Sequence, residues 1–318
     1  MKGRTKRTRN RKRGRQTIRG GRTLTPHKQS QCSPFKQTLS YSCLSSNALS
    51  MVAKAVHKFE PSLTLKQPDK QLYKDICEIL KKSSTCNTEA CWLQIRTLMN
   101  QLSPSERKYF RSHFRPHMPE ELVNNYKEWI SNYNIKEVID QYHNDLPEFY
   151  SYGAVPLDFR KCSVSSLCTI DIKKHINKGE HKIGIIFNTD ESDEPGEHWI
   201  AMYIDIAGKN LDGQPGIYYF DSFGHEPEQE ITDLIERITN QSSNLQQPET
   251  TNPLEFIVTH NKKTIQNNSF SCGFYCMHFM EHMIKEYPFK KYLNSGLSDK
   301  VMIDYQRTCY LHPDEIKY

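Results

Sequence analysis

The first 59 residues of the chain contain no aspartate or glutamate. The first acidic residue is Glu60, although the 318-residue chain has 37 Asp and Glu in total. The same 59 residues hold 15 of the 43 Lys and Arg, so the remainder of the chain is net negative. The segment MKGRTKRTRNRKRGRQTIRGGR (1–22) also has almost no hydrophobic residue, and such a segment cannot bury enough apolar surface to fold. We predict a basic, largely disordered arm over residues 1–59, attached to an acidic body.

Residues 1–22 also lack aromatic side chains on which bases could stack, which argues against sequence-specific recognition of a nucleic acid. The arm could still bind phosphate backbones without sequence preference, by releasing counterions. A nuclear targeting signal and a solubilising tail have the same composition. Non-specific nucleic-acid binding is therefore one of three open interpretations of the arm.

Long hydrophobic runs are absent. A run such as IGIIF (184–188) is far too short to span a bilayer, and the N-terminus lacks the apolar core of a secretory signal, so we expect no membrane segment. The ten cysteines form no repeating framework, and without a secretory signal reduced thiols are expected. Cys86 and Cys91 lack the second pair that a zinc tetrahedron needs, and we predict that they are buried or structural.

The chain behind the arm divides at about residue 120. Residues 60–120 have the apolar spacing of helices, which we predict over 69–82, 89–102 and 103–110, the last with Ser103 as cap and Pro104 in the first turn. Residues 121–318 are predicted to form one further domain. Its elements are helices at 119–130, 134–146, 272–286 and 298–311, and strands at 182–189, 198–206, 216–223 and 254–261. Helices, then a sheet, then helices indicate an α+β fold.

The stretch FSCGFYCMHFMEHM (270–283) contains two incompatible candidate active sites. In the first, Cys272 begins a helix behind the polar loop QNNS (266–269), with Ser269 or Ser271 as the cap. A helix N-terminus favours the thiolate form that a nucleophile needs. An isolated cysteine on an apolar helix face is nevertheless more often a core residue. Other residues must therefore support a catalytic role for Cys272.

The second candidate is H-x-x-E-H, formed by His278, Glu281 and His282, which is the zinc signature of inverzincin metallopeptidases. Such enzymes need a third ligand well downstream, and only 36 residues follow His282. On a helical wheel the three side chains share a side with Lys285, so a solvated helix face explains them. We therefore predict that the thiol does the chemistry, with no metal and no cofactor.

Three further polar residues could complete a site around Cys272. A catalytic thiol needs a base, a group that orients the base, and donors for the oxyanion. His198 begins the predicted strand HWIAMYIDI (198–206), and Asp221 lies at the end of the next one, in YYFDSFG. Gln266 stands six residues before Cys272, where its amide could donate to an oxyanion beside the Cys272 N–H. Each residue alone also fits an ordinary surface, turn or loop position.

The order of these residues resembles a known group of enzymes. The motifs His198-Trp199, Asp221-Ser222 and Gln266-x5-Cys272-Gly273 are similar to those of the adenovirus-proteinase and SUMO-protease clan of cysteine peptidases. The resemblance implies Cys272 as nucleophile and His198 as general base. Asp221 would orient His198, Gln266 would hold the oxyanion, and Trp199 would shield the site from water. The resemblance also implies a central, mostly antiparallel sheet flanked by helices.

The likeness is greatest to the virion peptidases of large cytoplasmic DNA viruses, over residues 85–311. Outside the motifs it is carried by residues 86–93, 129–159 and 297–311. It implies an endopeptidase that cleaves viral core or capsid precursors after a small residue, as in Gly-Gly-X, in the virion and in the virus factories of the host cytoplasm. Two alternatives stay open: an isopeptidase that removes ubiquitin-like modifiers, and a structural virion protein that the arm tethers to nucleic acid.

Two features bear on substrate binding. Gly20-Gly21-Arg22 in the arm would suit the implied specificity as a self-cleavage site, although glycines are also ordinary in a flexible basic tail. The acidic loop TDESDEPGE (189–197) would attract basic substrates and favour the imidazolium form of His198.

Overall fold

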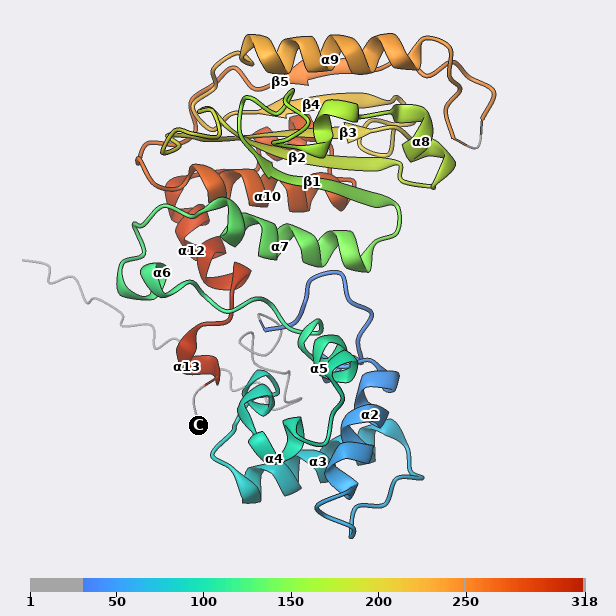
Figure 1. Ribbon diagram of the computed structural model, residues 1–318, viewed down its shortest axis with the longest axis vertical. Helices are drawn as coiled ribbons and strands as arrows, with labels where there is room; N and C mark the ends of the chain where they lie inside the picture. Colours follow the sequence, from blue (N-terminus) through green and yellow to red (C-terminus); the bar gives the residue numbers. More distant parts are fainter. Residues whose placement is uncertain (1–30, 249, 317–318) are drawn as a thin grey trace, which may run out of the picture.

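The computed structural model describes residues 31–248 and 250–316, so the basic segment 1–22 lies outside the described residues. The centre is a five-stranded sheet in the order β1-β2-β3-β4-β5 (Figure 1). The strands are β1 (Phe149–Val155), β2 (Lys182–Asn188), β3 (Trp199–Asp205), β4 (Gly216–Phe220) and β5 (Ile257–His260). The inner pairs are antiparallel and the two outer pairs are parallel. The predicted α+β fold is confirmed, but the sheet is mixed rather than mostly antiparallel.

Both edge strands are parallel to their neighbours because helical crossovers connect them. Helix α8 (Ile172–Asn177) lies between β1 and β2 in the sequence, and α9 (Gln229–Ser242) lies between β4 and β5. A parallel pair needs such a crossover, since a tight hairpin can join only antiparallel strands. Strand β1 was not predicted. Its register shifts between Ser151 and Ala154, where Gly153 has a φ of +77°, and a glycine inside a strand weakens the sequence pattern of the strand.

Helices cover both faces of the sheet (Figure 1). Helices α8 and α9 pack on one face around a core rich in isoleucine. The other face carries α7 (Asn132–Asp145), α10 (Cys272–Ile284), α11 (Phe289–Leu293) and α12 (Asp299–Cys309). Helix α10 approaches β2 closely because Gly184 has no side chain: a Cβ there would lie 2.6 Å from Sδ of Met280. The catalytic candidate Cys272 therefore begins a helix that is packed directly on the sheet.

A helical unit with its own apolar core precedes the sheet. It consists of α2 (Ser46–His57), α3 (Asp69–Ser83), η1 (Ala90–Gln94), α4 (Arg96–Met99) and α5 (Pro104–Arg111). Helix α5 begins as predicted, with a capping box between Ser103 and Glu106. The predicted helix over 89–102 is divided because Ile95 has extended backbone. Within the described ranges, no helix is long and apolar enough to cross a bilayer.

The prediction of a largely disordered arm is wrong for residues 31–59. Helix α2 lies in this range and is capped by the side chain of Ser45. The side chains of this helix that the core buries are Ala48, Leu49, Val52, Ala53, Ala55 and Val56. Upstream of α2, Lys36 pairs with Asp145 at the end of α7, with 2.6 Å between Nζ and Oδ1. The absence of acidic residues determines only the charge of this segment. Its apolar residues are spaced to lie on one face of a helix, and that face is buried.

The described chain contains three disulfides, Cys32–Cys43, Cys86–Cys91 and Cys162–Cys168. The expectation of reduced thiols is therefore wrong for these cysteines. Each pair closes a short loop, and local turns bring the two sulfur atoms together without any repeating framework in the sequence. Cys86 and Cys91 are buried and disulfide-bonded, so the prediction that they are buried or structural is confirmed.

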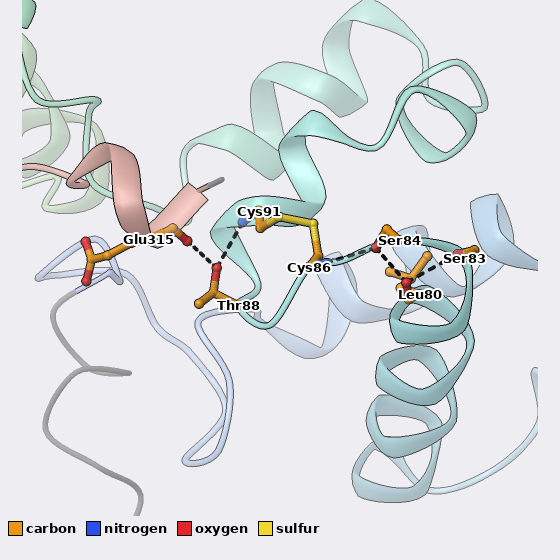
Figure 2. The surroundings of a disulfide bond; sticks show 7 residues. All are labelled: Leu80, Ser83, Ser84, Cys86, Thr88, Cys91 and Glu315. Carbon is orange, nitrogen blue, oxygen red and sulfur yellow. Dashed lines mark hydrogen bonds between the residues drawn. A yellow bond between two sulfur atoms is a disulfide. The ribbon is translucent and has the colours of Figure 1, made fainter. Parts of the chain in front are cut away.

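The Cys86–Cys91 loop contacts the C-terminal helix α13 (Pro313–Ile316) (Figure 2). Within the loop, the hydroxyl of Thr88 donates a hydrogen bond to the carbonyl of Glu315. Just before α13, Leu311 exchanges backbone hydrogen bonds with the segment that follows α5, and its side chain enters the core of the helical unit. The C-terminal segment thus fastens the helical unit to the half of the molecule that carries the sheet.

The segment between the two halves differs from its prediction. The helix expected over 119–130 is only α6 (Glu120–Asn124), because Asn125 has extended backbone. The residues after it run without regular structure to α7 and leave Tyr126 and Trp129 about half exposed. This segment passes the N-terminal end of α10, where Ile130 contacts the position of Gly273.

Candidate active site

Cys272 is the first residue of α10, and it is 4% exposed. Ser271 is the N-cap residue, as one of the two predicted candidates, but its side chain does not cap the helix. Instead its hydroxyl accepts a hydrogen bond from Asn268, at 2.9 Å from Nδ2. The first N–H groups of a helix have no partner within the helix. The N–H of Cys272 is one of them, so it is available to a group bound beside the thiol.

Antiparallel pairing brings His198 and Asp221 together. Ala201 of β3 pairs with Phe220 of β4, so the start of one strand and the end of the other lie at the same edge of the sheet. His198 immediately precedes β3, and Asp221 immediately follows β4. Nε2 of His198 lies 2.6 Å from Oδ1 of Asp221. Two residues 23 positions apart in the sequence therefore form one hydrogen-bonded pair.

The surroundings of His198 favour its charged form. Burial alone would lower the pKa of His198, but hydrogen bonds and charge interactions with Asp221 and Cys272 outweigh burial and raise the pKa to about 9. Since Nε2 faces Asp221, Nδ1 is the ring nitrogen left to bond the thiol. The contributions that raise this pKa come from Asp221 and Cys272, rather than from the acidic loop 189–197 that was expected to supply them.

Asp221 is fixed by the turn that follows β4. The carboxylate accepts the backbone N–H groups of Phe223 and His225, each at 2.9 Å. Its backbone is held by Asn261, whose side chain accepts the Asp221 N–H and donates to the Asp221 carbonyl. Burial would raise the pKa of Asp221, but His198 and the two N–H groups bind the charged form and lower it. The carboxylate is therefore ionised and aimed at the imidazole.

The side chain of Gln266 is buried next to this turn. Its Oε1 accepts a hydrogen bond from the hydroxyl of Ser222 at 2.7 Å, and its Nε2 donates to the carbonyl of Asn268, also at 2.7 Å. A carboxamide has two N–H donors, so one of them is left for a bound group. The structure thus fixes the orientation of the amide predicted to bind the oxyanion.

Three residues with positioning roles were not identified from the sequence. Asn261 holds Asp221, Ser222 holds the Gln266 amide, and Asn268 binds both Gln266 and the backbone N–H of Ser271. Ser222 lies within the recognised Asp-Ser motif, which was a usable signal. Asn261 and Asn268 stand in polar loops, and no spacing distinguishes them from other loop asparagines.

Trp199 lies over the N-terminal end of α10 and is 8% exposed. Its indole Nε1 donates to the carbonyl of Ile130 at 3.1 Å. Gly273 makes this packing possible, because a Cβ there would lie 2.5 Å from Cδ1 of Ile130 and 3.3 Å from Cδ1 of Trp199. The predicted place of Trp199 beside the site is therefore the observed one.

A cleft of about 670 Å³ has Trp199 among its lining residues. The connecting segment 129–132, the end of β2 and the acidic loop line it. Among its lining side chains are Trp129, Glu191 and Glu194. The cleft is large enough for several residues of an extended polypeptide, and its lining includes Trp199, which packs against the start of α10.

Cys276, one turn along α10 from Cys272, is the nearest other thiol. It is fully buried, and burial raises the pKa of its thiol well above the usual range. A thiol that stays protonated in an apolar core is a poor nucleophile. Of the two cysteines on α10, only Cys272 therefore has a base and a helix terminus beside it.

The H-x-x-E-H side chains have structural roles. Glu281 is 7% exposed and binds Lys285, Tyr142 and Tyr305 at 2.6, 3.1 and 2.9 Å, so the predicted solvated face is wrong for this residue. Burial would raise the pKa of Glu281, but Lys285, the nearby charge of Arg115 and the hydrogen bond from Tyr305 lower it to about 2. In the part of the chain that the structure describes, no group of three or more His, Cys, Asp or Glu side chains is arranged to hold a metal ion.

The comparisons with known proteins agree with this geometry. Residues 170–317 match the Ulp1 protease family, C-terminal catalytic domain. A protein of Acanthamoeba polyphaga mimivirus that is named as a thiol protease is 34% identical over 171 residues, which are 54% of this chain and 53% of that protein. The chain thus spans about half the length of this relative. A cysteine protease of African swine fever virus is 22% identical over 256 residues, or 74% of this chain and 88% of the relative.

The fold extends to a solved structure. The crystal structure of an African swine fever virus protease superposes with a TM-score of 0.63 and 18% sequence identity, covering 89% of this chain and 96% of that one. The coverage includes the helical unit as well as the sheet. The predicted resemblance to viral cysteine peptidases of this clan, and the predicted fold, are confirmed.

Proposed function

We propose that this chain, which belongs through residues 170–317 to the Ulp1 protease family of cysteine peptidases, is an endopeptidase that cleaves viral precursor proteins after a small residue, as in Gly-Gly-X. The observation that carries the proposal is the series Cys272, His198 and Asp221 at one edge of the sheet, with a cleft beside it. The named relatives are proteases of large DNA viruses, which supports a place in the virion and in cytoplasmic virus factories.

The reaction begins with the thiolate of Cys272 and the imidazolium of His198. The sulfur attacks the carbonyl carbon of the small residue, and the new oxyanion accepts the Cys272 N–H and the remaining N–H of Gln266. His198 then protonates the leaving amine as the peptide C–N bond breaks. A water molecule, deprotonated by His198, hydrolyses the thioester and restores the thiolate. Asp221 stays ionised throughout and stabilises the imidazolium.

A neutral peptide that contains Gly-Gly-X tests this proposal. We expect cleavage after the second glycine, and we expect Cys272→Ala and His198→Ala to remove it. Cys276→Ala is the matched control, because it changes the neighbouring thiol and leaves the predicted site intact. The proposal would be contradicted if the unaltered chain cleaves no Gly-Gly-X or Ala-Gly-X peptide while circular dichroism shows that it is folded.

A second candidate function uses the same site on another substrate. Relatives from African swine fever virus are named SUMO-1 cysteine proteases, which favours an isopeptidase that removes ubiquitin-like modifiers. Both activities cleave after Gly-Gly, so the catalytic residues do not separate them. The two activities are separated by comparing kcat/KM for a Gly-Gly-X peptide with kcat/KM for a ubiquitin-like protein joined to lysine. A preference of more than about a hundredfold for the ubiquitin-like conjugate would favour the isopeptidase.

A third candidate is a virion component whose arm binds nucleic acid. It predicts that Cys272→Ser preserves function in infected cells and that deletion of residues 1–23 abolishes it. The ordered arrangement of His198 and Asp221 around the thiol gives this candidate less support than the peptidase.

A further inference from the structure

The cleft beside Trp199 combines negative charge with an exposed aromatic surface. Glu191 and Glu194 line it, and the side-chain Oε2 of Glu194 accepts the N–H of Glu191 at 3.0 Å, which holds this part of the loop in place. Trp129 lines the same cleft and is 52% exposed. Carboxylates next to an indole face suit a guanidinium group, which pairs with the acids and stacks on the ring.

The charge of the cleft remains negative after its nearest lysine is counted. Lys161 lies 3.4 Å from Glu191 and 3.1 Å from Asp158, so it is shared between two carboxylates. Two further loop residues, Asp193 and Glu197, are exposed and have no ion pair with a described residue. A basic segment would therefore be attracted to this face over distances of about 8–10 Å, and less strongly in high salt.

The chain itself contains a segment with the matching chemistry. Residues 14–22 read GRQTIRGGR, in which Gly20-Gly21 follows Arg19 and precedes Arg22. We propose that the cleft binds the basic arm of this chain and that Cys272 cleaves it after Gly21. This inference rests on the proposed peptidase function. The occupant of the cleft is then the arm, whose arginines would pair with Glu191 and Glu194 and stack on Trp129.

The length of chain outside the described residues permits this placement. Phe35 lies under Lys285, which follows the C-terminal end of α10, whereas Cys272 lies at the other end. The 13 residues of α10 correspond to about 20 Å along the helix axis. Residues 22–30 can extend over about 30 Å. The described chain begins four residues before Phe35, at Gln31, whose carbonyl accepts the N–H of Arg115. From there an extended segment 22–30 can carry Gly21 toward Cys272 of its own chain or of a neighbouring copy.

The cleavage step has a simple balance. The thiolate of Cys272 forms a bond to the carbonyl carbon of Gly21, and the bond to the nitrogen of Arg22 breaks. His198 supplies the proton to the new amine of Arg22. Water hydrolyses the thioester, so that Gly21 becomes a C-terminal carboxylate and the arm of 21 residues is released. No other reactant is required.

The N-terminus of the purified full-length chain tests the cleavage. We expect the active chain to begin at Arg22 by intact mass, while Cys272→Ala retains the arm. Gly21→Val in the active chain should also retain it, because a branched side chain replaces the small residue at the bond. Removal of the arm from Cys272→Ala at the same bond would overturn the inference, since another protease would be responsible.

A synthetic peptide of residues 14–28 tests the cleft. Its kcat/KM is compared with that of the same peptide carrying Gln at the positions of Arg15 and Arg19. The ratio compared is kcat/KM for the arginine peptide divided by kcat/KM for the Gln peptide. This ratio should fall about fivefold in the variant Glu191→Gln/Glu194→Gln, and 0.5 M NaCl should lower it in the unaltered chain. Glu236→Gln, an exposed acid on α9 on the other face of the sheet, should leave the ratio unchanged.

The outcomes separate this inference from the proposed function. If a neutral Gly-Gly-X peptide is cleaved while the arm stays intact in the active chain and in the peptide, the inference is wrong and the peptidase function stands. If neither is cleaved, the peptidase function is wrong. Cleavage of the arm with a ratio that ignores Glu191 and Glu194 would overturn the assignment of the cleft.

Discussion

The hydroxyl of Ser222 donates a hydrogen bond to Oε1 of Gln266 across 2.7 Å, and both side chains are buried. Ser222 directly follows Asp221, whose carboxylate bonds His198. One turn after β4 therefore positions two groups of the site: the carboxylate that orients the base and the amide predicted to bind the oxyanion. The backbone N–H groups of Ile265 and Gln266 also donate to the carbonyl of Ser222, so the link is made by main chain and side chain together.

Replacing Ser222 with Ala should lower kcat more than it changes KM. The Gln266 amide would lose the bond that fixes Oε1, and a misaligned N–H stabilises the oxyanion less well. We expect a loss of about tenfold in kcat, smaller than the 10²–10³-fold typical of removing an oxyanion donor outright. The measurement is steady-state hydrolysis of a Gly-Gly-X peptide by the Ser222→Ala and Gln266→Ala variants.

Two matched variants control this prediction. Ser222→Thr keeps the hydroxyl and should recover part of the rate. Ser269→Ala removes an exposed hydroxyl from the same loop and should change nothing. If Ser222→Ala raises KM and leaves kcat intact, the hydrogen bond to Gln266 does not serve the transition state.

The pKa of His198, raised to about 9, predicts an alkaline limit of activity. The thiolate–imidazolium pair loses the proton needed by the leaving amine as the pH passes that value, so kcat/KM should fall above about pH 9. Asp221→Asn removes the charge that helps to raise the pKa, so the limit should move to lower pH. The pH profile of kcat/KM for both proteins, from pH 6 to 10, provides the measurement.

The same shift affects stability. The pKa of His198 is higher in the folded protein than the ordinary value of 6.5, so the pairing contributes its full stability below about pH 6.5 and loses it as the pH rises through about 9. The difference in Tm between the unaltered chain and His198→Gln should therefore shrink from pH 7 to pH 10. A difference that grows over this range would contradict the charged pair.

The cysteines should divide into two chemical groups under non-reducing conditions. Cys77, Cys272, Cys276 and Cys309 retain thiols, while the six cysteines of the three disulfides do not. Iodoacetamide at mildly acidic pH should modify Cys272 far faster than the other thiols, because only Cys272 has an imidazolium beside it. Mass spectrometry across all ten cysteines measures the rates, and His198→Ala should remove the advantage.

Equal reactivity of Cys272 and Cys77 would contradict the activated thiolate. Cys276 and Cys309 serve as internal references, because burial raises the pKa of both thiols, that of Cys309 to about 12. Alkylation of Cys86 or Cys162 before reduction would show that those disulfides are absent.

Loss of the Cys86–Cys91 disulfide should lower the stability of the helical unit. In the chain-entropy account, a crosslink over so short a loop contributes about 2 kcal/mol. We expect a decrease of a few degrees in Tm for Cys86→Ser/Cys91→Ser, measured by calorimetry without reductant. Thr88→Val is the comparison, since it removes the contact with Glu315 and keeps the disulfide. A Tm equal to that of the unaltered chain would show that the loop is held by its packing alone.

The sequence was informative where one chemical constraint dominates a segment. Alternating apolar residues identified β2, β3 and β4, and the order of His198, Asp221, Gln266 and Cys272, through its resemblance to known cysteine peptidases, indicated the candidate site. Prediction failed where long-range packing decides the structure. Glu281 is charged, yet α10 is buried on nearly every side. The carboxylate of Glu281 accepts hydrogen bonds from tyrosines of α7 and α12. Such partners are distant in the sequence, and no local pattern indicates them.

The charge of the N-terminal region shows a second limit. The absence of acidic residues before Glu60 separated a basic arm from the body, although the described fold already includes residues 31–59. Composition averages over a segment, whereas burial depends on the position of each apolar residue. Leu49 and Val52 are fully buried in a segment whose net charge suggested a solvated chain.

The last prediction concerns the close packing of Gly273 against Ile130. A methyl group at this position would lie 2.5 Å from Cδ1 of Ile130, closer than side-chain carbons approach, so Gly273→Ala must displace Ile130. The carbonyl of Ile130 accepts the indole N–H of Trp199, and a shift there would move the ring that packs at the start of α10, next to Cys272. We expect Gly273→Ala to reduce kcat/KM about tenfold, with little change in far-ultraviolet circular dichroism.

Ile130→Ala should restore part of the loss, because it removes both Ile130 carbons that the new methyl group would meet. The test is a double-mutant cycle on kcat/KM, in which directly contacting residues show coupling and independent ones add. We expect Gly273→Ala/Ile130→Ala to be several-fold more active than the product of the two single effects. Additive losses would mean that the glycine serves the backbone of α10 itself rather than the contact that positions Trp199.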